Sequence, residues 1–247
     1  MMTNKIQHLQ SYKYAALHLK SNPSITKAYS VIVNNNVFNK NKKINKSIIS
    51  NQTDICIDGP YRCANHFMLE AMSTVYPKLN IAHHYHSPGS IKLALRYNLP
   101  CIFVLRKPID QIASTKIFLP NLSIDFIIYE SLSFYRSLKE YQNDIICSDF
   151  KRSINNINSI VNELHSRFLI EPKIKNYDLS IENYRNLVID RKSSIVLDKS
   201  RSPIPSIERG IRKDLIKDQI NFKLSNTKNG KSLEDIYKIF NELSLKS

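Results

Sequence analysis

The chain has 247 residues, 42% of them hydrophobic, and a formal net charge of +15 at pH 7. That length suits one large α/β domain or two small ones, with enough apolar residues to fill a core. Because no run of about eighteen apolar residues occurs and the N-terminus lacks a signal-peptide stretch, we predict a cytoplasmic protein without a membrane span.

Residues 1–50 carry no chemical motif. We predict that they form an N-terminal helical extension, with partial disorder as the alternative, on a main domain of residues 51–247. Within the extension, residues 12–19 are predicted to be helical. Residues 39–46 are predicted to be a basic, solvated loop, with a binding patch as the alternative.

From residue 55 onward, short apolar runs alternate with helical patterns. This alternation predicts a three-layer α/β/α fold with a mostly parallel central sheet and C-terminal helices. The predicted strands are 55–57, 78–82, 100–105 and 144–147. The predicted helices follow the turn at 59–60 and then occupy 89–97, 109–118, 123–141, 154–168, 207–220 and 231–243, with 171–205 irregular.

The stretch 54–72 reads as strand, tight turn and helix. Gly59 and Pro60 form the turn, and Arg62 lies within it. The first N–H groups of a helix have no internal partner, and the helix dipole favours negative charge there. The stretch therefore predicts a phosphate or sulfate site, although many such units bind nothing. The nucleoside-triphosphate loop Gly-x-x-x-x-Gly-Lys-[Ser/Thr] is absent, which disfavours an ATPase or GTPase.

Basic side chains follow three of the predicted strands, where ligands of parallel sheets bind. They are Arg62, His83, His84, His86 and Arg106. Three histidines within four residues could also hold a metal, but no Cys or carboxylate stands close in sequence to complete that site, so we predict no metal. The four cysteines form no Cys-x-x-Cys pair, which disfavours a zinc or redox motif.

The segment 106–114 reads Arg-Lys-Pro-Ile-Asp-Gln-Ile-Ala-Ser, directly after an apolar strand. It resembles the 3′-phosphate-binding segment of sulfotransferases that use 3′-phosphoadenosine-5′-phosphosulfate (PAPS). The loop 61–66, Tyr-Arg-Cys-Ala-Asn-His, resembles the family's 5′-phosphosulfate loop. The run 81–88 is similar to the segment that carries the family's catalytic His. The resemblance covers roughly 53–170 and implies a P-loop nucleotide-hydrolase-like fold of the bacterial sulfotransferase type.

The family implies a role for each matching position. Arg62 would contact the sulfonate and the bridging oxygen, and the loop residues Cys63, Ala64, Asn65 and His66 would bind the 5′-phosphate. His86 would be the general base, and His84 would lie near the sulfonate. The 3′-phosphate would be bound by Arg106 and Ser114, with Arg209 as a further contact. The implied reaction is metal-independent transfer of a sulfonate group from PAPS to a hydroxyl or amine.

The loop departs from the family pattern at five positions. Pro60 stands one place earlier than the family's Pro, and Cys63 stands where the family has Ser. Ala64 stands where the family has Gly, and Asn65 and His66 stand where it has hydroxyl residues. The alternative is therefore a catalytically degenerate protein of the same fold that binds a nucleotide or a polyanion. A P-loop small-molecule kinase is a further alternative.

The positive charge favours an acidic partner. The sequence does not name the acceptor, although the charge mildly favours a carbohydrate or other polyanion. Because basic residues are spread along the chain, no specific nucleic acid is expected.

Overall fold

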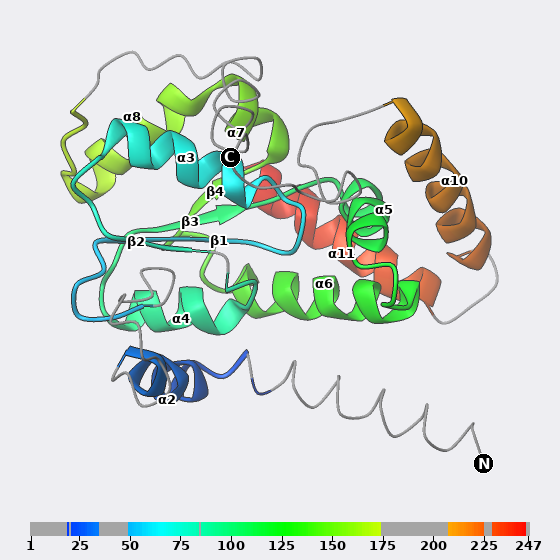
Figure 1. Ribbon diagram of the computed structural model, residues 1–247, viewed down its shortest axis with the longest axis horizontal. Helices are drawn as coiled ribbons and strands as arrows, with labels where there is room; N and C mark the ends of the chain where they lie inside the picture. Colours follow the sequence, from blue (N-terminus) through cyan, green and yellow to red (C-terminus); the bar gives the residue numbers. More distant parts are fainter. Residues whose placement is uncertain are drawn as a thin grey trace, which may run out of the picture.

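A four-stranded sheet lies at the centre of the computed structural model, which describes residues 19, 21–34, 49–83, 85–173, 207–224 and 229–245 (Figure 1). The strands are β1 (Ile55–Asp58), β2 (Ile81–His83), β3 (Cys101–Val104) and β4 (Ile146–Ser148), in the order β2-β1-β3-β4. Every neighbouring pair is parallel. The predicted α/β class and parallel sheet are confirmed.

Helices cover both faces of this sheet (Figure 1). One face carries α3 (Asn65–Val75), α7 (Phe150–Asn155) and α8 (Ile157–Phe168). The other carries α4 (Pro88–Arg96), α6 (Ile124–Lys139) and α11 (Asn229–Ser244). The arrangement is consistent with the predicted three layers.

Alternation of side chains along each strand produces two apolar cores, as expected for a parallel sheet covered on both sides. The core under α3 and α8 receives Ile55, Ile57, Ile81, Ile102, Val104 and Ile146 from the strands. The core under α4, α6 and α11 receives Cys56, Ala82, Cys101, Phe103, Leu105 and Cys147.

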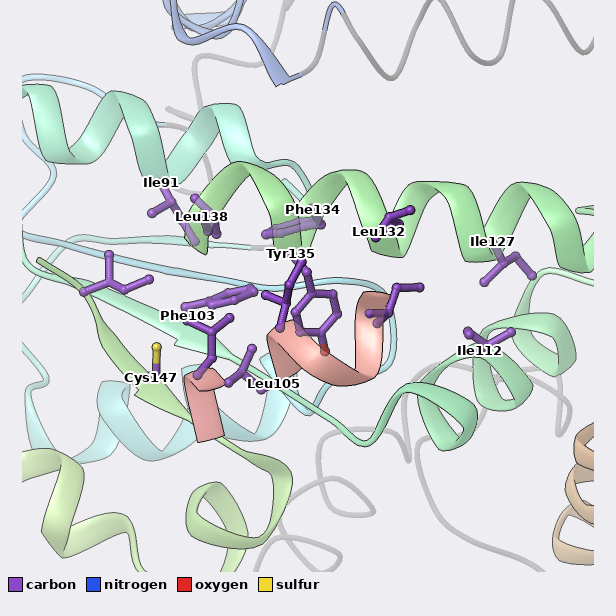
Figure 2. Close-up of a cluster of buried hydrophobic side chains, with 14 of the residues drawn as sticks. Ile91, Phe103, Leu105, Ile112, Ile127, Leu132, Phe134, Tyr135, Leu138 and Cys147 are labelled. Carbon is purple, nitrogen blue, oxygen red and sulfur yellow. The ribbon is translucent and has the colours of Figure 1, made fainter. Parts of the chain in front are cut away.

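Aromatic rings fill the second of these cores (Figure 2). Phe103 of β3 stacks on Phe134 of α6, with ring centroids 5.4 Å apart, and meets Tyr135 edge-on at 5.9 Å. The Tyr135 hydroxyl donates to the carbonyl of Arg106, 3.1 Å away. This hydrogen bond links the core to the chain that leaves β3.

Three further helices complete the described structure. Helix α2 (Pro23–Asn34) packs on α4, and α5 (Pro108–Phe118) packs against α10 (Ile207–Leu224). Within the described ranges, no helix is both long enough and apolar enough to cross a membrane.

Several predicted boundaries were wrong. The helix predicted at 154–168 is two helices, because Asn156 leaves helical geometry and its side chain caps α8 by accepting from the Ser159 N–H. The strand predicted at 78–82 begins later, because Leu79 is held in a turn by its N–H bond to the Tyr76 carbonyl.

A helix that was not individually predicted lies within residues 1–50. Helix α2 was missed, although the Asn22 side chain caps it and Pro23 opens it, a recognisable start signal. The helix predicted at 12–19 lies almost wholly outside the described residues. The basic loop at 39–46 and most of the irregular stretch at 171–205 lie outside them as well.

The chain order places a topological switch between β1 and β3. The chain runs from β1 outward to β2 and then returns to β3 on the other side of β1. In open parallel sheets, ligands bind beyond the carboxyl ends of the strands at this point, because the two connections diverge there.

Leu138→Ala is expected to lower the free energy of unfolding by about 2–5 kcal/mol, because Leu138 is fully buried in the aromatic core and truncation leaves a cavity. Leu169→Ala removes the same atoms from a side chain that is 80% exposed and should change it by less than about 0.5 kcal/mol. Urea denaturation of both variants measures the difference. Equal effects would contradict the described core.

Candidate functional site

The turn after β1 fits against the end of β3. A Cβ added to Gly59 would lie 2.3 Å from the Val104 carbonyl oxygen, so only glycine allows this approach. The turn therefore lies directly at the switch between the two central strands.

The backbone conformation of this turn alternates between left-handed and other geometry before α3 begins. Arg62 (φ 67°) and Ala64 (φ 73°) are left-handed, and Cys63 between them is not. Such alternation points successive N–H groups inward and forms an anion-binding concavity, known as a nest. The backbone N–H groups of Cys63, Ala64 and Asn65 have no acceptor among the described residues. These three N–H donors and the positive end of the α3 dipole lie together in this turn.

Arg106, the second residue after β3, brings a cation to the same turn. Its Nη1 donates to the Arg62 carbonyl at 2.9 Å, and its guanidinium lies 4.2 Å from the centre of the Phe150 ring. Burial lowers the pKa of Arg106, although a guanidinium remains protonated. Within the described ranges, no carboxylate forms an ion pair with it. A partly desolvated cation without a carboxylate favours an external anion.

Helix α5 holds the turn from the opposite side. The Arg62 Nε donates to the Ser114 hydroxyl oxygen at 3.3 Å. Ser114 is only 6% exposed, but a hydroxyl that accepts from Arg62 keeps its own hydrogen to donate. Gln111 and Thr115 both donate to the Tyr61 carbonyl, at 2.9 and 3.2 Å. These two were missed from the sequence, although they lie in the helical turns beside Ser114.

His86 lies against the same turn from the β2–α4 connection. Its Nδ1 is 2.9 Å from the Gly59 carbonyl and 3.3 Å from the Asn65 amide nitrogen. That amide nitrogen already donates to the Gly59 and Pro60 carbonyls. We therefore assign the ring proton to Nδ1, which donates to Gly59 and leaves the lone pair on Nε2. The Tyr61 ring lies 4.1 Å from the imidazole, centre to centre.

Asp58, the last residue of β1, was also missed. Its carboxylate is 1% exposed and accepts from the N–H groups of Gly59 and His86 at 2.9 and 3.0 Å. It also accepts from Ser87 and Ser90. Burial raises the pKa of Asp58, whereas these donors and the nearby His86 oppose that shift. An acidic residue directly before Gly-Pro at the end of an apolar strand is the signal that could have found it.

The structure thus brings together seven of the predicted residues at one edge of the sheet: Arg62, Cys63, Ala64, Asn65, His86, Arg106 and Ser114. Cys63 is fully buried, and burial raises its thiol pKa to about 12, so it offers its backbone rather than a nucleophile.

Four other predicted residues are not among these seven. His66 is exposed near the start of α3. Burial, helped by the neighbouring His66 and His86, lowers the pKa of His83, at the end of β2, to about 4. His84 and the side chain of Arg209 lie outside what the structure describes.

Two lysines of helix α10 form ion pairs with one carboxylate of α5, and these ion pairs hold α10 near Arg106. Lys213 and Lys217 lie 2.7 and 2.9 Å from the Asp110 carboxylate in the first turn of α5. Burial raises the pKa of Asp110, but the two lysines outweigh burial and bring it to about 2. Burial lowers the pKa of Lys213, and its bond to Asp110 opposes that shift.

No protein-family model matches this chain, and neither a curated protein nor a solved structure does. In the part of the chain that the structure describes, no three His, Cys, Asp or Glu side chains are grouped to hold a metal. What the site does must therefore be argued from its own donors and charges.

Ala64→Gly is expected to raise the free energy of unfolding by about 0.5–1 kcal/mol. A left-handed residue with a Cβ costs about 1–2 kcal/mol, and the greater freedom of glycine in the unfolded chain offsets part of the gain. Ala71→Gly, within α3 at right-handed geometry, should lower it by about 1 kcal/mol or more. Thermal or urea unfolding decides, and changes of the same sign would contradict the described turn.

Asp110→Asn is expected to lower the free energy of unfolding by about 2 kcal/mol at neutral pH. The folded pKa of about 2 lies below the usual 3.8, so this stabilisation is present above about pH 4 and is lost as the pH falls towards 2. The difference between wild type and variant, followed by urea denaturation, should therefore shrink from pH 5 to pH 3. In a Lys213→Met, Lys217→Met background the substitution should show little of this pH dependence. A constant difference in the wild-type background would refute the pairing.

Proposed function

We propose that this chain binds PAPS at the switch between β1 and β3 and transfers its sulfonate group to a hydroxyl or amine acceptor. The observation that carries the proposal is the pairing of two anion-seeking features. The N–H groups of Cys63, Ala64 and Asn65, which have no acceptor among the described residues, lie beside Arg106, a cation without a described carboxylate partner. Two such features suit a ligand with two separate anionic groups.

The proposed contacts follow the two features. The N–H groups of Cys63, Ala64 and Asn65 hold the 5′-phosphate, since phosphate binds well at a helix N-terminus. Arg106 holds the 3′-phosphate with its remaining donors. Ser114 donates its hydroxyl hydrogen to the same phosphate while still accepting from Arg62. His66, His84 and Arg209 remain predicted contacts of the donor.

The proposed chemistry is an in-line displacement at sulfur. The acceptor oxygen or nitrogen forms a bond to sulfur as the bond from sulfur to the bridging phosphate oxygen breaks. The acceptor's proton goes to Nε2 of His86, and the electron pair of the broken bond stays on the 5′-phosphate. Arg62 stabilises the charge that develops on the leaving phosphate.

One observation favours a second candidate function, a nucleotide or polyanion binder without turnover. Both hydrogens of the Asn65 side-chain amide are used within the turn, on the Gly59 and Pro60 carbonyls. Asn65 therefore reaches a phosphate only through its backbone, where the family has a hydroxyl. Such a protein would bind the desulfonated donor, 3′-phosphoadenosine-5′-phosphate (PAP), yet transfer nothing.

The acceptor class stays open within this proposal. The overall positive charge favours an anionic acceptor such as a polysaccharide. A cytoplasmic location and the absence of a specific nucleic-acid partner also remain predictions.

Calorimetric titration tests the donor site. PAP should bind, and adenosine 5′-monophosphate, which lacks the 3′-phosphate, should bind at least about 100-fold more weakly, because the charge-assisted bonds to Arg106 are lost. Magnesium-ATP should bind no better than the monophosphate. A preference for magnesium-ATP would overturn the proposal in favour of a kinase. No binding of PAP or of magnesium-ATP would overturn the proposal without supporting a kinase.

Substitution of Arg106 localises the effect. Arg106→Ala should weaken PAP binding about 100-fold, and Arg106→Lys should weaken it less, since it keeps the charge but loses the fork of donors. Arg96→Ala is the matched control, because Arg96 is exposed at the end of α4, which leads into the opposite edge of the sheet. Unchanged affinity in Arg106→Ala would sink the assignment.

A further inference from the structure

Asp58 occupies a position that the proposed reaction leaves unexplained. Its carboxylate is almost fully buried at the end of β1, where an unpaired charge is costly. Each oxygen has two donors. Oδ1 accepts from the N–H groups of Gly59 and His86, and Oδ2 accepts from the Ser87 N–H at 3.4 Å and the Ser90 hydroxyl at 2.6 Å.

These donors come from two different segments. Gly59 begins the turn that holds the proposed phosphate site, and the other three lie in the connection from β2 to α4 and the start of α4. One carboxylate therefore fixes the distance between the anion-binding turn and His86. Its bond to the His86 N–H also holds a residue at φ 50°, a left-handed conformation that is unfavourable for histidine.

Asp58 also bears on the imidazole itself. Its Oδ1 lies 3.9 Å from His86 Nδ1, whose proton is donated to the Gly59 carbonyl. Taking a proton on Nε2 gives the ring a positive charge, and the buried Asp58 carboxylate lies beside it and attracts that charge.

We infer that Asp58 is a positioning residue, which orients His86 against the anion-binding turn and stabilises the imidazolium formed when His86 accepts a proton. This inference rests on the proposed function, since it needs His86 to act as a base. It assigns to Asp58 a role exerted through His86 and the turn at Gly59, with no contact to the donor or the acceptor.

Asp58→Asn tests the charge with the least change of shape. The Asn Oδ1 still accepts from the N–H groups of Gly59 and His86, and the Asn side-chain NH2 can donate to the Ser90 hydroxyl oxygen. The Ser90 hydroxyl hydrogen is then donated to the Ser87 carbonyl. Binding is measured by calorimetry with PAP. Proton abstraction is measured without an acceptor, as release of sulfate from radiolabelled PAPS with water as the attacking hydroxyl.

The variant should bind PAP within about threefold of wild type and release sulfate at least about tenfold more slowly. Asp54→Asn is the matched control. Asp54 accepts from the Asn80 N–H near the opposite end of β1 and should leave both quantities unchanged. Ser90→Ala removes one donor to Asp58 but keeps the charge beside His86, and should slow release by less than about threefold.

The outcomes separate the two claims. Sulfate release at the wild-type rate in Asp58→Asn would overturn the inference and leave the proposed function intact. An equal loss of sulfate release in Ser90→Ala and Asp58→Asn would overturn the inference in favour of a purely structural role for Asp58. The same conclusion would follow if Asp58→Asn lost its thermal unfolding transition and Ser90→Ala released sulfate no faster than Asp58→Asn. Wild-type protein that binds PAP but releases no sulfate above the spontaneous rate would overturn both the base and its positioning residue. No PAP binding would overturn the proposed function itself.

Discussion

The close approach of Gly59 to the Val104 carbonyl is the constraint on which the site depends. It exists because β1 and β3 are parallel neighbours and because no side chain stands between their carboxyl ends. Once the two strand ends meet, the turn after β1 and the residue Arg106 after β3 lie within one hydrogen bond of each other. Two segments 44 residues apart then form a single electropositive edge.

Backbone strain gathers at this edge. Arg62, Ala64 and His86 all have positive φ, and all three belong to the proposed site. Such strain persists only where surrounding bonds hold it, and here α5 holds the turn through the Tyr61 carbonyl while Asp58 holds His86. The Asn65 Oδ1, buried and without a donor among the described residues, is a further local cost. Burial of the two apolar cores stabilises the fold and offsets the cost of this strain.

The sequence predicted the sheet well and the site in part. Apolar runs bounded by turn residues located all four strands, since burial on both faces leaves a strong signal. The basic residues at strand ends were also recognisable, because parallel strands deliver their carboxyl ends to one edge. Asp58, Gln111 and Thr115 were not, since their role comes from carbonyls and N–H groups that only the folded chain brings near. The break at Asn156 was missed because an apolar pattern continues through it.

If one nucleotide bridges the turn after β1 and Arg106, a crystal structure of the chain with PAP should show both of its phosphates at this edge of the sheet. The 5′-phosphate oxygens should lie about 2.9 Å from the N–H groups of Cys63, Ala64 and Asn65, and the 3′-phosphate should lie on the Arg106 guanidinium. A nucleotide bound away from this edge, or one with its 3′-phosphate in solvent, would contradict the proposal.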